Sequence, residues 1–202
     1  MSDSFGIPQI MTYLSQMGLK IAHVDQEQEI IELAFQGDHS QWRMVVSIQQ
    51  SGEVRNLILV TPHIGAVTTS KRLECLEALM AVNYRIAMGK FGLDLDDGEI
   101  RLGEVIPLAN NAITFEQFQL AFRAIIQTTL MYHSLLPRII YDNLSVEDAL
   151  QCCEQEFFQE AGQSDPTPTT AQEVAGEANE QPELDVDDVM AEVTRFFEEH
   201  NE

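Results

Sequence analysis

The sequence has few of the features that would tie it to nucleic acid, to a membrane or to an oxidising compartment. It contains three cysteines, two of them adjacent, which is too few for a disulfide framework. Only eleven residues are lysine or arginine, and they form no basic cluster. The electrostatic attraction that dominates nucleic-acid binding is therefore weak, and an anionic membrane would repel the chain. We expect neither nucleic acid nor a membrane as a partner.

Long apolar segments are also missing. The longest apolar runs, such as Leu57 to Val60, are far shorter than the roughly 20 residues that a membrane-spanning helix needs. The first ten residues, MSDSFGIPQI, lack the basic region and apolar stretch of a secretory signal. We therefore expect a cytoplasmic protein.

What the sequence has in excess is negative charge. The net charge is -22, and the last 49 positions, from Glu154 onward, hold fifteen of the 33 acidic residues but only one of the eleven basic ones. Residues 161–183 are rich in Gly, Ser, Thr, Pro, Gln and acidic residues and show no hydrophobic periodicity. Such a segment cannot bury enough surface to offset its chain entropy. We expect one domain over residues 1–160, with its core at about 5–140, and a disordered acidic linker at 161–183.

Hydrophobic periodicity predicts an α+β fold for that domain. Helical spacing predicts a helix at 7–17, and Ser70 can cap a later helix after a loop at 61–69. The apolar stripe of this later helix contains Leu73, Leu76, Met80 and Tyr84. Period-two alternation between the two helices predicts an antiparallel meander. Its strands cover residues 19–24, 30–35, 42–48 and 54–60.

The second half of the domain is predicted to hold a hairpin and two helices. The hairpin spans residues 91–102, with Asp97-Gly98 as its turn. Thr114 and Gln117 fit a capping box that begins a long apolar helix, and Ser145 can cap a further one. The sequence therefore predicts an antiparallel sheet, made of the meander and the hairpin, packed against helices.

The order of these elements resembles the YbjN family. The resemblance covers residues 5–140 and is strongest at 83–108, in the run NYRIAMGKFGLDLDDGEIRL and the following Ile106-Pro107-Leu108. This family is similar in fold to the type III secretion chaperones and is variously labelled as a sensory transduction regulator. The resemblance implies an acidic α+β domain, often a dimer, that offers apolar surface to segments of other proteins and has no known catalytic activity.

No residue pattern in the sequence indicates catalysis, a cofactor or a metal. The acidic run at 94–99 resembles a calcium loop, but its glycine is at the fifth position and Val105 is at the twelfth, so we expect a solvated hairpin turn. The five histidines are scattered and show no paired metal-ligand spacing. A zinc site would therefore have to be assembled from residues that are distant in the sequence. Cys153 lies on an apolar stripe, so we expect it to be buried beside a more exposed Cys152. We find neither a Gly-x-Ser-x-Gly motif nor a phosphate-binding loop.

Asn83 is the polar residue whose position most needs an explanation. It lies on the apolar face of its predicted helix, so its amide needs hydrogen-bond partners if it is buried. Two interpretations remain open. Asn83 either ties the helix to neighbouring backbone or, with Tyr84 and Arg85, lies at the interface of a homodimer.

Apolar residues return at helical spacing within residues 184–200, which predicts an amphipathic helix. An isolated helix of this length is marginally stable in water, so we expect it to fold against a partner or against the domain itself. The other interpretation is a fortuitous pattern in a disordered tail. The predicted partner-binding residues are Val186, Val189, Met190, Val193, Phe196 and Phe197.

These features favour a non-enzymatic, chaperone-like protein whose apolar surface binds segments of partner proteins, with the acidic tail modulating recognition. The second hypothesis is a signalling or regulatory adaptor that docks on one folded partner. The third is an enzyme whose active site forms only in the fold, and none of the required residue clusters is visible for it.

Overall fold

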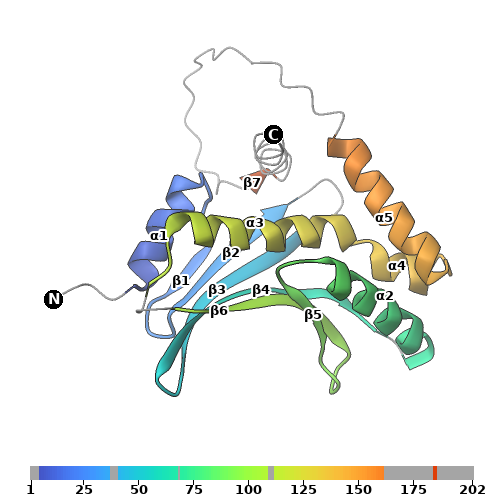
Figure 1. Ribbon diagram of the computed structural model, residues 1–202, viewed down its shortest axis with the longest axis horizontal. Coiled ribbons are helices and arrows are strands. Elements are labelled where there is room, and N and C mark those ends of the chain that lie inside the picture. The colour runs from blue at the N-terminus through green and yellow to red at the C-terminus, as the bar shows by residue number, and fades with distance from the viewer. Residues whose placement is uncertain (1–4, 37–40, 68, 109–111, 162–183, 186–202) are drawn as a thin grey trace, which may run out of the picture.

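The computed structural model describes residues 5–36, 41–67, 69–108, 112–161 and 184–185. Six strands form one antiparallel sheet in the spatial order β1-β2-β3-β4-β6-β5, and helices pack against it (Figure 1). The strands are β1 (His23–Asp25), β2 (Ile30–Gln36), β3 (Gln41–Ser51), β4 (Val54–Ala66), β5 (Lys90–Leu93) and β6 (Glu99–Pro107). The predicted α+β class, with a meander and a hairpin in one antiparallel sheet, is confirmed.

The helices form two groups (Figure 1). Helices α1 (Ile7–Gln16) and α3 (Phe115–Tyr132) lie along one face of the sheet. Helices α2 (Arg72–Arg85), α4 (Leu135–Ile140) and α5 (Val146–Ala161) pack on one another near β5. A short 3-10 helix, η1 (Thr69–Lys71), precedes α2. This second group therefore places α2 at one end of the sheet.

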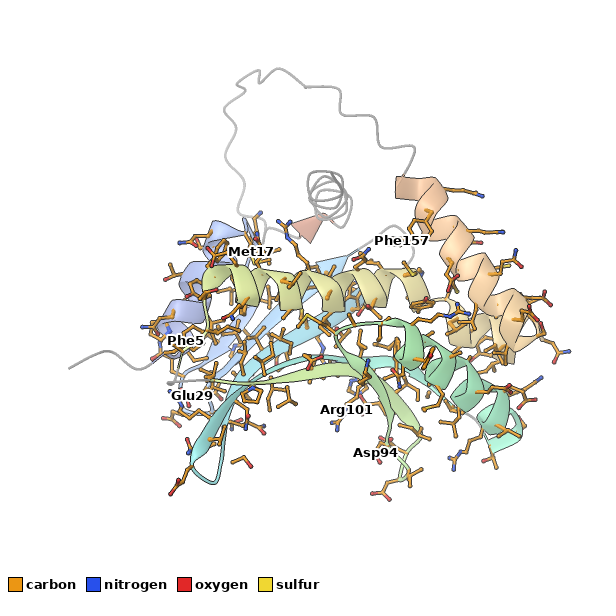
Figure 2. The ribbon with its side chains drawn as sticks, viewed as in Figure 1. Phe5, Met17, Glu29, Asp94, Arg101 and Phe157 are labelled. Carbon is orange, nitrogen blue, oxygen red and sulfur yellow. The ribbon has the colours of Figure 1, made fainter. Side chains whose placement is uncertain are left out.

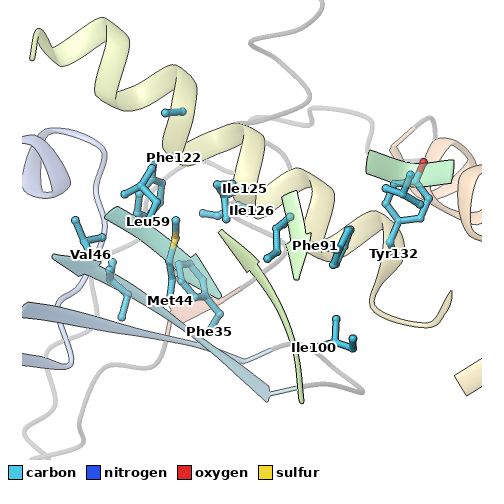
Figure 3. Close-up of a cluster of buried hydrophobic side chains, with 14 of the residues drawn as sticks. Phe35, Met44, Val46, Leu59, Phe91, Ile100, Phe122, Ile125, Ile126 and Tyr132 are labelled. Carbon is cyan, nitrogen blue, oxygen red and sulfur yellow. The ribbon is translucent and has the colours of Figure 1, made fainter. Parts of the chain in front are cut away.

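The core lies between the sheet and α3 (Figure 3). Phe118, Phe122 and Ile125 are fully buried along the face of α3 that meets the sheet, where Met44 and Leu59 are also fully buried. The helix begins where its capping box predicts, because Gln117 N donates to Thr114 Oγ1 at 3.3 Å and Thr114 N donates to Gln117 Oε1 at 3.1 Å. The predicted start of this helix is confirmed.

The predicted loop at 61–69 is wrong, because β4 continues to Ala66. The pairing of β4 with β6 shifts register between Thr61 and Gly65, and His63 in that stretch has a φ of 54°. An irregularity of this kind absorbs extra residues and lets the ladder resume. Pro62 lies within the shift, where its missing N–H costs no ladder hydrogen bond, so it does not end the strand as its sequence context suggests.

Two predicted element starts are also corrected. The first strand covers only His23–Asp25, because Leu19 N donates to Leu14 O and so belongs to the end of α1, beyond Gly18 with its φ of 72°. Ser70 lies in η1 and is not the N-cap residue of α2, because α2 begins at Arg72 and Lys71 occupies its N-cap position. The hairpin between β5 and β6 is confirmed, although its turn spans residues 94–98 rather than two residues.

A seventh strand comes from the tail. Leu184–Asp185 forms β7, which pairs in parallel with β2 (Figure 1). The predicted amphipathic helix was placed at 184–200, so its first two residues lie in this strand. The predicted linker at 161–183 begins with Ala161, which is the last residue of α5. Its other residues, and the rest of the predicted helix, lie outside the described residues.

Candidate functional site

The side chain of Asn83 joins α2 to the edge strand of the hairpin. Its Nδ2 donates to Phe91 O at 3.1 Å, and its Oδ1 accepts from Phe91 N at 2.7 Å. This pair of hydrogen bonds satisfies the outer backbone groups of β5 as a further strand would. Lys90 Nζ donates to Asn83 O and Ile86 O, which satisfies carbonyls at the end of α2. A role for Asn83 in a homodimer stays a prediction.

Arg85 connects α2 to α5, whereas Tyr84 contacts little. Arg85 Nη1 lies 2.5 Å from Glu154 Oε1, and the same carboxylate oxygen accepts from Tyr132 Oη at 3.1 Å. Tyr84 is 94% exposed. Three helices therefore meet at the Glu154 carboxylate, which fixes α2 in place while Tyr84 faces solvent.

The carboxylate of Glu154 helps to raise the pKa of the Tyr132 phenol. Burial, the charge of Glu154 and the hydrogen bond to it raise the pKa of Tyr132 to about 12. The folded state therefore favours the neutral phenol, and the stability that this preference contributes is complete below pH 10 and lost as the pH rises from 10 to 12. We expect Tyr132→Phe to remove the latest phenolate absorbance step from a titration of the folded chain. Tyr84→Phe is the control and should keep this step. If Tyr84→Phe lost the step while Tyr132→Phe kept it, the assignment of the step to Tyr132 would be contradicted.

The outward face of α2 carries an apolar stripe, which we call the α2 stripe. Its members are Leu73, Met80 and Tyr84, which are 75%, 65% and 94% exposed. Their spacing of seven and four residues places them along one side of the helix, with Glu77 between the first two. Large apolar side chains that gather on one exposed face mark a surface for binding another molecule.

The apolar stripe predicted for this helix would be expected to face the core, because apolar side chains favour burial. For Leu73, Met80 and Tyr84 that expectation is wrong, since all three are exposed. The buried residues of α2 are Cys75, Ala78, Leu79 and Val82. Small side chains among them let α2 pack against α4 and α5. The exposure of this stripe does not follow from the sequence pattern alone, and the signal for it is a helix with apolar residues on two faces.

The carboxylates of the acidic hairpin turn accept hydrogen bonds from the backbone of the turn itself. Asp94 Oδ1 accepts from Asp96 N, and Asp97 Oδ1 accepts from Glu99 N, each at 2.9 Å. Glu99 Oε1 accepts from His63 N, and Gly98 at the tip has a φ of 80°. Figure 2 shows Asp94 at the end of the hairpin that points away from α3. Within the described ranges, no three His, Cys, Asp or Glu side chains are arranged to hold a metal ion.

The three cysteines are free thiols, and two of them, Cys75 and Cys153, are buried. Cys153 is buried, as predicted, and Cys152 is partly exposed. Burial raises the pKa of the Cys153 thiol despite the nearby Ser134 and Arg138. A protonated, buried thiol is a poor nucleophile. The arrangement therefore gives no support to cysteine chemistry.

The predicted partner-binding residues of the tail belong to the part of the chain that follows β7. Val186, Val189, Met190, Val193, Phe196 and Phe197 all lie outside the described residues. The described part of the tail is Leu184–Asp185, on the outer edge of β2. The structure thus brings together Asn83, Tyr84 and Arg85 at one end of α2.

The fold and this surface define an α+β domain with an exposed apolar helix face and, in its described part, no metal-binding cluster. A family model described as "YbjN: Putative bacterial sensory transduction regulator" matches residues 8–136. The chain belongs to the YbjN family, as its resemblance predicts.

Two solved structures are similar to the chain. One is described as "Crystal structure of YbjN, a putative transcription regulator from E. coli", with 16% sequence identity and a TM-score of 0.44. The other is described as "Crystal Structure of the ExsC-ExsE Complex", with 18% identity and a TM-score of 0.46. Each match covers 64% of this chain and 92% of the other. No curated protein matches the chain.

In the residues that the structure describes, no helix is both long and apolar enough to cross a bilayer. The longest of the described helices, α3, contains 18 residues, and its apolar face packs in the core.

Proposed function

We propose that this protein is a non-enzymatic, chaperone-like protein-binding module of the cytoplasm that presents the α2 stripe to segments of partner proteins. The exposed stripe is the observation that carries the proposal. Complete burial of a Leu, Met or aromatic side chain contributes about 1.5–3 kcal/mol, so a partner that covers all three gains roughly 4–9 kcal/mol to set against the cost of association.

The way α2 is held supports this role. Its inner face packs on α4 and α5, Asn83 bonds to β5, and Arg85 pairs with Glu154. A helix fixed at both its inner face and its C-terminal end loses little conformational freedom on binding, which lowers the entropic cost of association. The stripe is therefore suited to take up the apolar face of a partner segment.

The acidic tail is proposed to modulate recognition. Like charges repel, so fifteen acidic residues from Glu154 onward discourage non-specific association with other acidic surfaces. The predicted helix at residues 186–197 is proposed as a second partner-binding element, in cis or in trans. The linker at 161–183 would span about 25–30 Å as a flexible chain, which is enough to reach the domain's own surface.

Two other uses of the same stripe compete with this proposal. A regulatory adaptor would bind one folded partner there, and the description of the family as a sensory transduction regulator favours that alternative. A homodimer would pair the stripes of two copies, with Asn83, Tyr84 and Arg85 near the interface. The net charge of -22 opposes the association of two copies at low ionic strength.

Affinity capture with the full chain tests the proposal. Chains bound in the native cytoplasm would be identified with and without crosslinking, and the mass of the purified protein would be measured by sedimentation equilibrium. Many unfolded or nascent chains at low stoichiometry are expected. One stoichiometric folded partner would establish the adaptor instead, a doubled mass would establish the homodimer, and the absence of any bound chain would contradict a binding function.

A further inference from the structure

The outer edge of β2 is only partly covered by its neighbour β1. On its inner side, β2 pairs with β3 along its whole length, from Ile30 opposite Ser47 to Gln36 opposite Gln41. On its outer side, β1 pairs only with residues 30–32. Leu33 to Gln36 therefore extend beyond β1. Backbone groups on such an edge can accept a further strand from another segment.

The chain's own tail provides a strand for this edge. Leu184 lies opposite Phe35, and Asp185 lies opposite Gln36. This pairing is parallel, whereas the pairings among β1 to β6 are antiparallel. The tail strand thus joins an otherwise complete antiparallel sheet from a segment far along the chain.

The edge is backed by a rigid aromatic pair. Phe35 is buried and stacks on Trp42, its cross-strand neighbour, with ring centroids 4.2 Å apart and an interplanar angle of 11°. The three paired positions Leu184, Phe35 and Trp42 thus form one row across β7, β2 and β3. Trp42 Nε1 is buried and has no hydrogen-bond partner among the described residues. The stacked pair holds this edge of the sheet in a fixed position for an incoming extended segment.

We propose that the outer edge of β2 at Phe35 and Gln36 is a strand-addition site whose occupant is the chain's own Leu184–Asp185. A partner is recognised there when it offers an extended segment with an apolar residue followed by an acidic one, running parallel to β2. The tail strand is then an internal competitor for that segment. This inference rests on the proposed function, because it supplies the site through which the tail modulates recognition.

The short length of β7 makes it replaceable. Two residues form at most a few backbone hydrogen bonds with β2, and each contributes little net free energy in water. Attachment to the same chain compensates, since a tethered segment acts at an effective concentration near the millimolar range. A partner segment that pairs with more of Leu33 to Gln36 would displace the tail strand.

Hydrogen exchange tests the pairing within the chain. Proline at both Leu184 and Asp185 removes whichever N–H faces β2. In the full chain, L184P/D185P should raise the exchange rate of the outward-facing amide at Phe35 or Gln36 by at least about tenfold, since its protecting partner is lost. Glu177→Pro, also in the tail, is the control and should change neither rate. Equal rates in all three proteins would overturn the proposed pairing.

Peptide binding tests recognition in trans. The probe is a labelled peptide with the sequence of residues 181–190, measured by fluorescence anisotropy against the full chain. It should bind L184P/D185P at least about tenfold more tightly than the wild type, because the internal competitor is gone. A peptide that carries the same two prolines should not bind. Equal affinity for the two proteins, or binding of the proline peptide, would overturn the recognition site.

A stripe variant separates this inference from the proposed function. Met80→Glu with Tyr84→Glu should leave both the peptide affinity and the exchange at Phe35 and Gln36 unchanged, because the stripe lies on a different element. If the peptide and exchange results fail while this variant loses its captured partners, the edge site is wrong and the α2 stripe stands. If the wild type captures no partners while the peptide binds as expected, the proposed role of the α2 stripe is wrong and the edge site stands.

Discussion

Met80→Glu combined with Tyr84→Glu is expected to lower partner capture by the full chain by at least about 100-fold. Both side chains project into solvent from the α2 stripe, at 65% and 94% exposure, so each would be covered in a complex. Removal of a side chain that is a hot spot of an interface costs about 2–4 kcal/mol of binding free energy. Glutamate adds the cost of burying a charge. The measurement is quantitative recovery of the bound chains by mass spectrometry.

The same double variant should fold normally, because neither residue contributes to the core. Its midpoint in thermal unfolding is expected to lie within a few degrees of the wild type. The matched control is Leu120→Glu with Phe158→Glu, which adds the same charge at residues that are 50% and 63% exposed on α3 and α5. If this control lost capture to the same extent, charge rather than the stripe would be responsible, and the proposed surface would be wrong.

Gly89→Ala is expected to lower the free energy of unfolding by about 2–5 kcal/mol. Gly89 has a φ of 78°, a conformation that costs a residue with a Cβ about 1–2 kcal/mol. A Cβ there would also lie 2.6 Å from Ile125 Cδ1 and 3.2 Å from Leu102 Cδ1, and overpacking adds about 1–3 kcal/mol. The substitution therefore strains the junction of α2 with the hairpin. Urea unfolding followed by circular dichroism measures the change.

Gly18→Ala is the matched control for this prediction. Gly18 has a similar φ of 72°, but a Cβ there would meet no atom within 4 Å. Its expected cost is about 1–2 kcal/mol, the conformational part alone. The excess for Gly89 then measures the steric contact with α3 and β6. An equal loss of unfolding free energy in the two variants would show that the side chains of Ile125 and Leu102 move away from the new Cβ without strain.

Local signals in the sequence predicted much of the fold. The capping box of Thr114 and Gln117 marks the start of α3, and Asp148 N donates to Ser145 Oγ at the start of α5 as the cap signal there predicts. The alternation in β2 and β3 predicts which side chains are buried, because one face of the sheet meets the helices. In each case residues close in sequence decide the structure.

The orientation of α2 and the pairing of β7 could not be predicted in the same way. Helix α2 has apolar residues on two faces, and its contacts with α4 and α5 decide which face is buried. Small residues such as Cys75 and Ala78 give a weaker hydrophobic signal than Leu73 and Met80, yet they permit the closer approach. The pairing of Leu184 with Phe35 joins positions that no local pattern relates.

Site-specific photo-crosslinking in the living cell tests the binding surface most directly. A photoreactive residue would replace Tyr84 in the full chain, with the same residue at Leu120 as the control. The account predicts protein adducts from position 84 that are absent from position 120, with other proteins rather than a second copy as their partners. Equal adduct yields at the two positions, or none at position 84, would contradict the claim that the α2 stripe binds partner proteins.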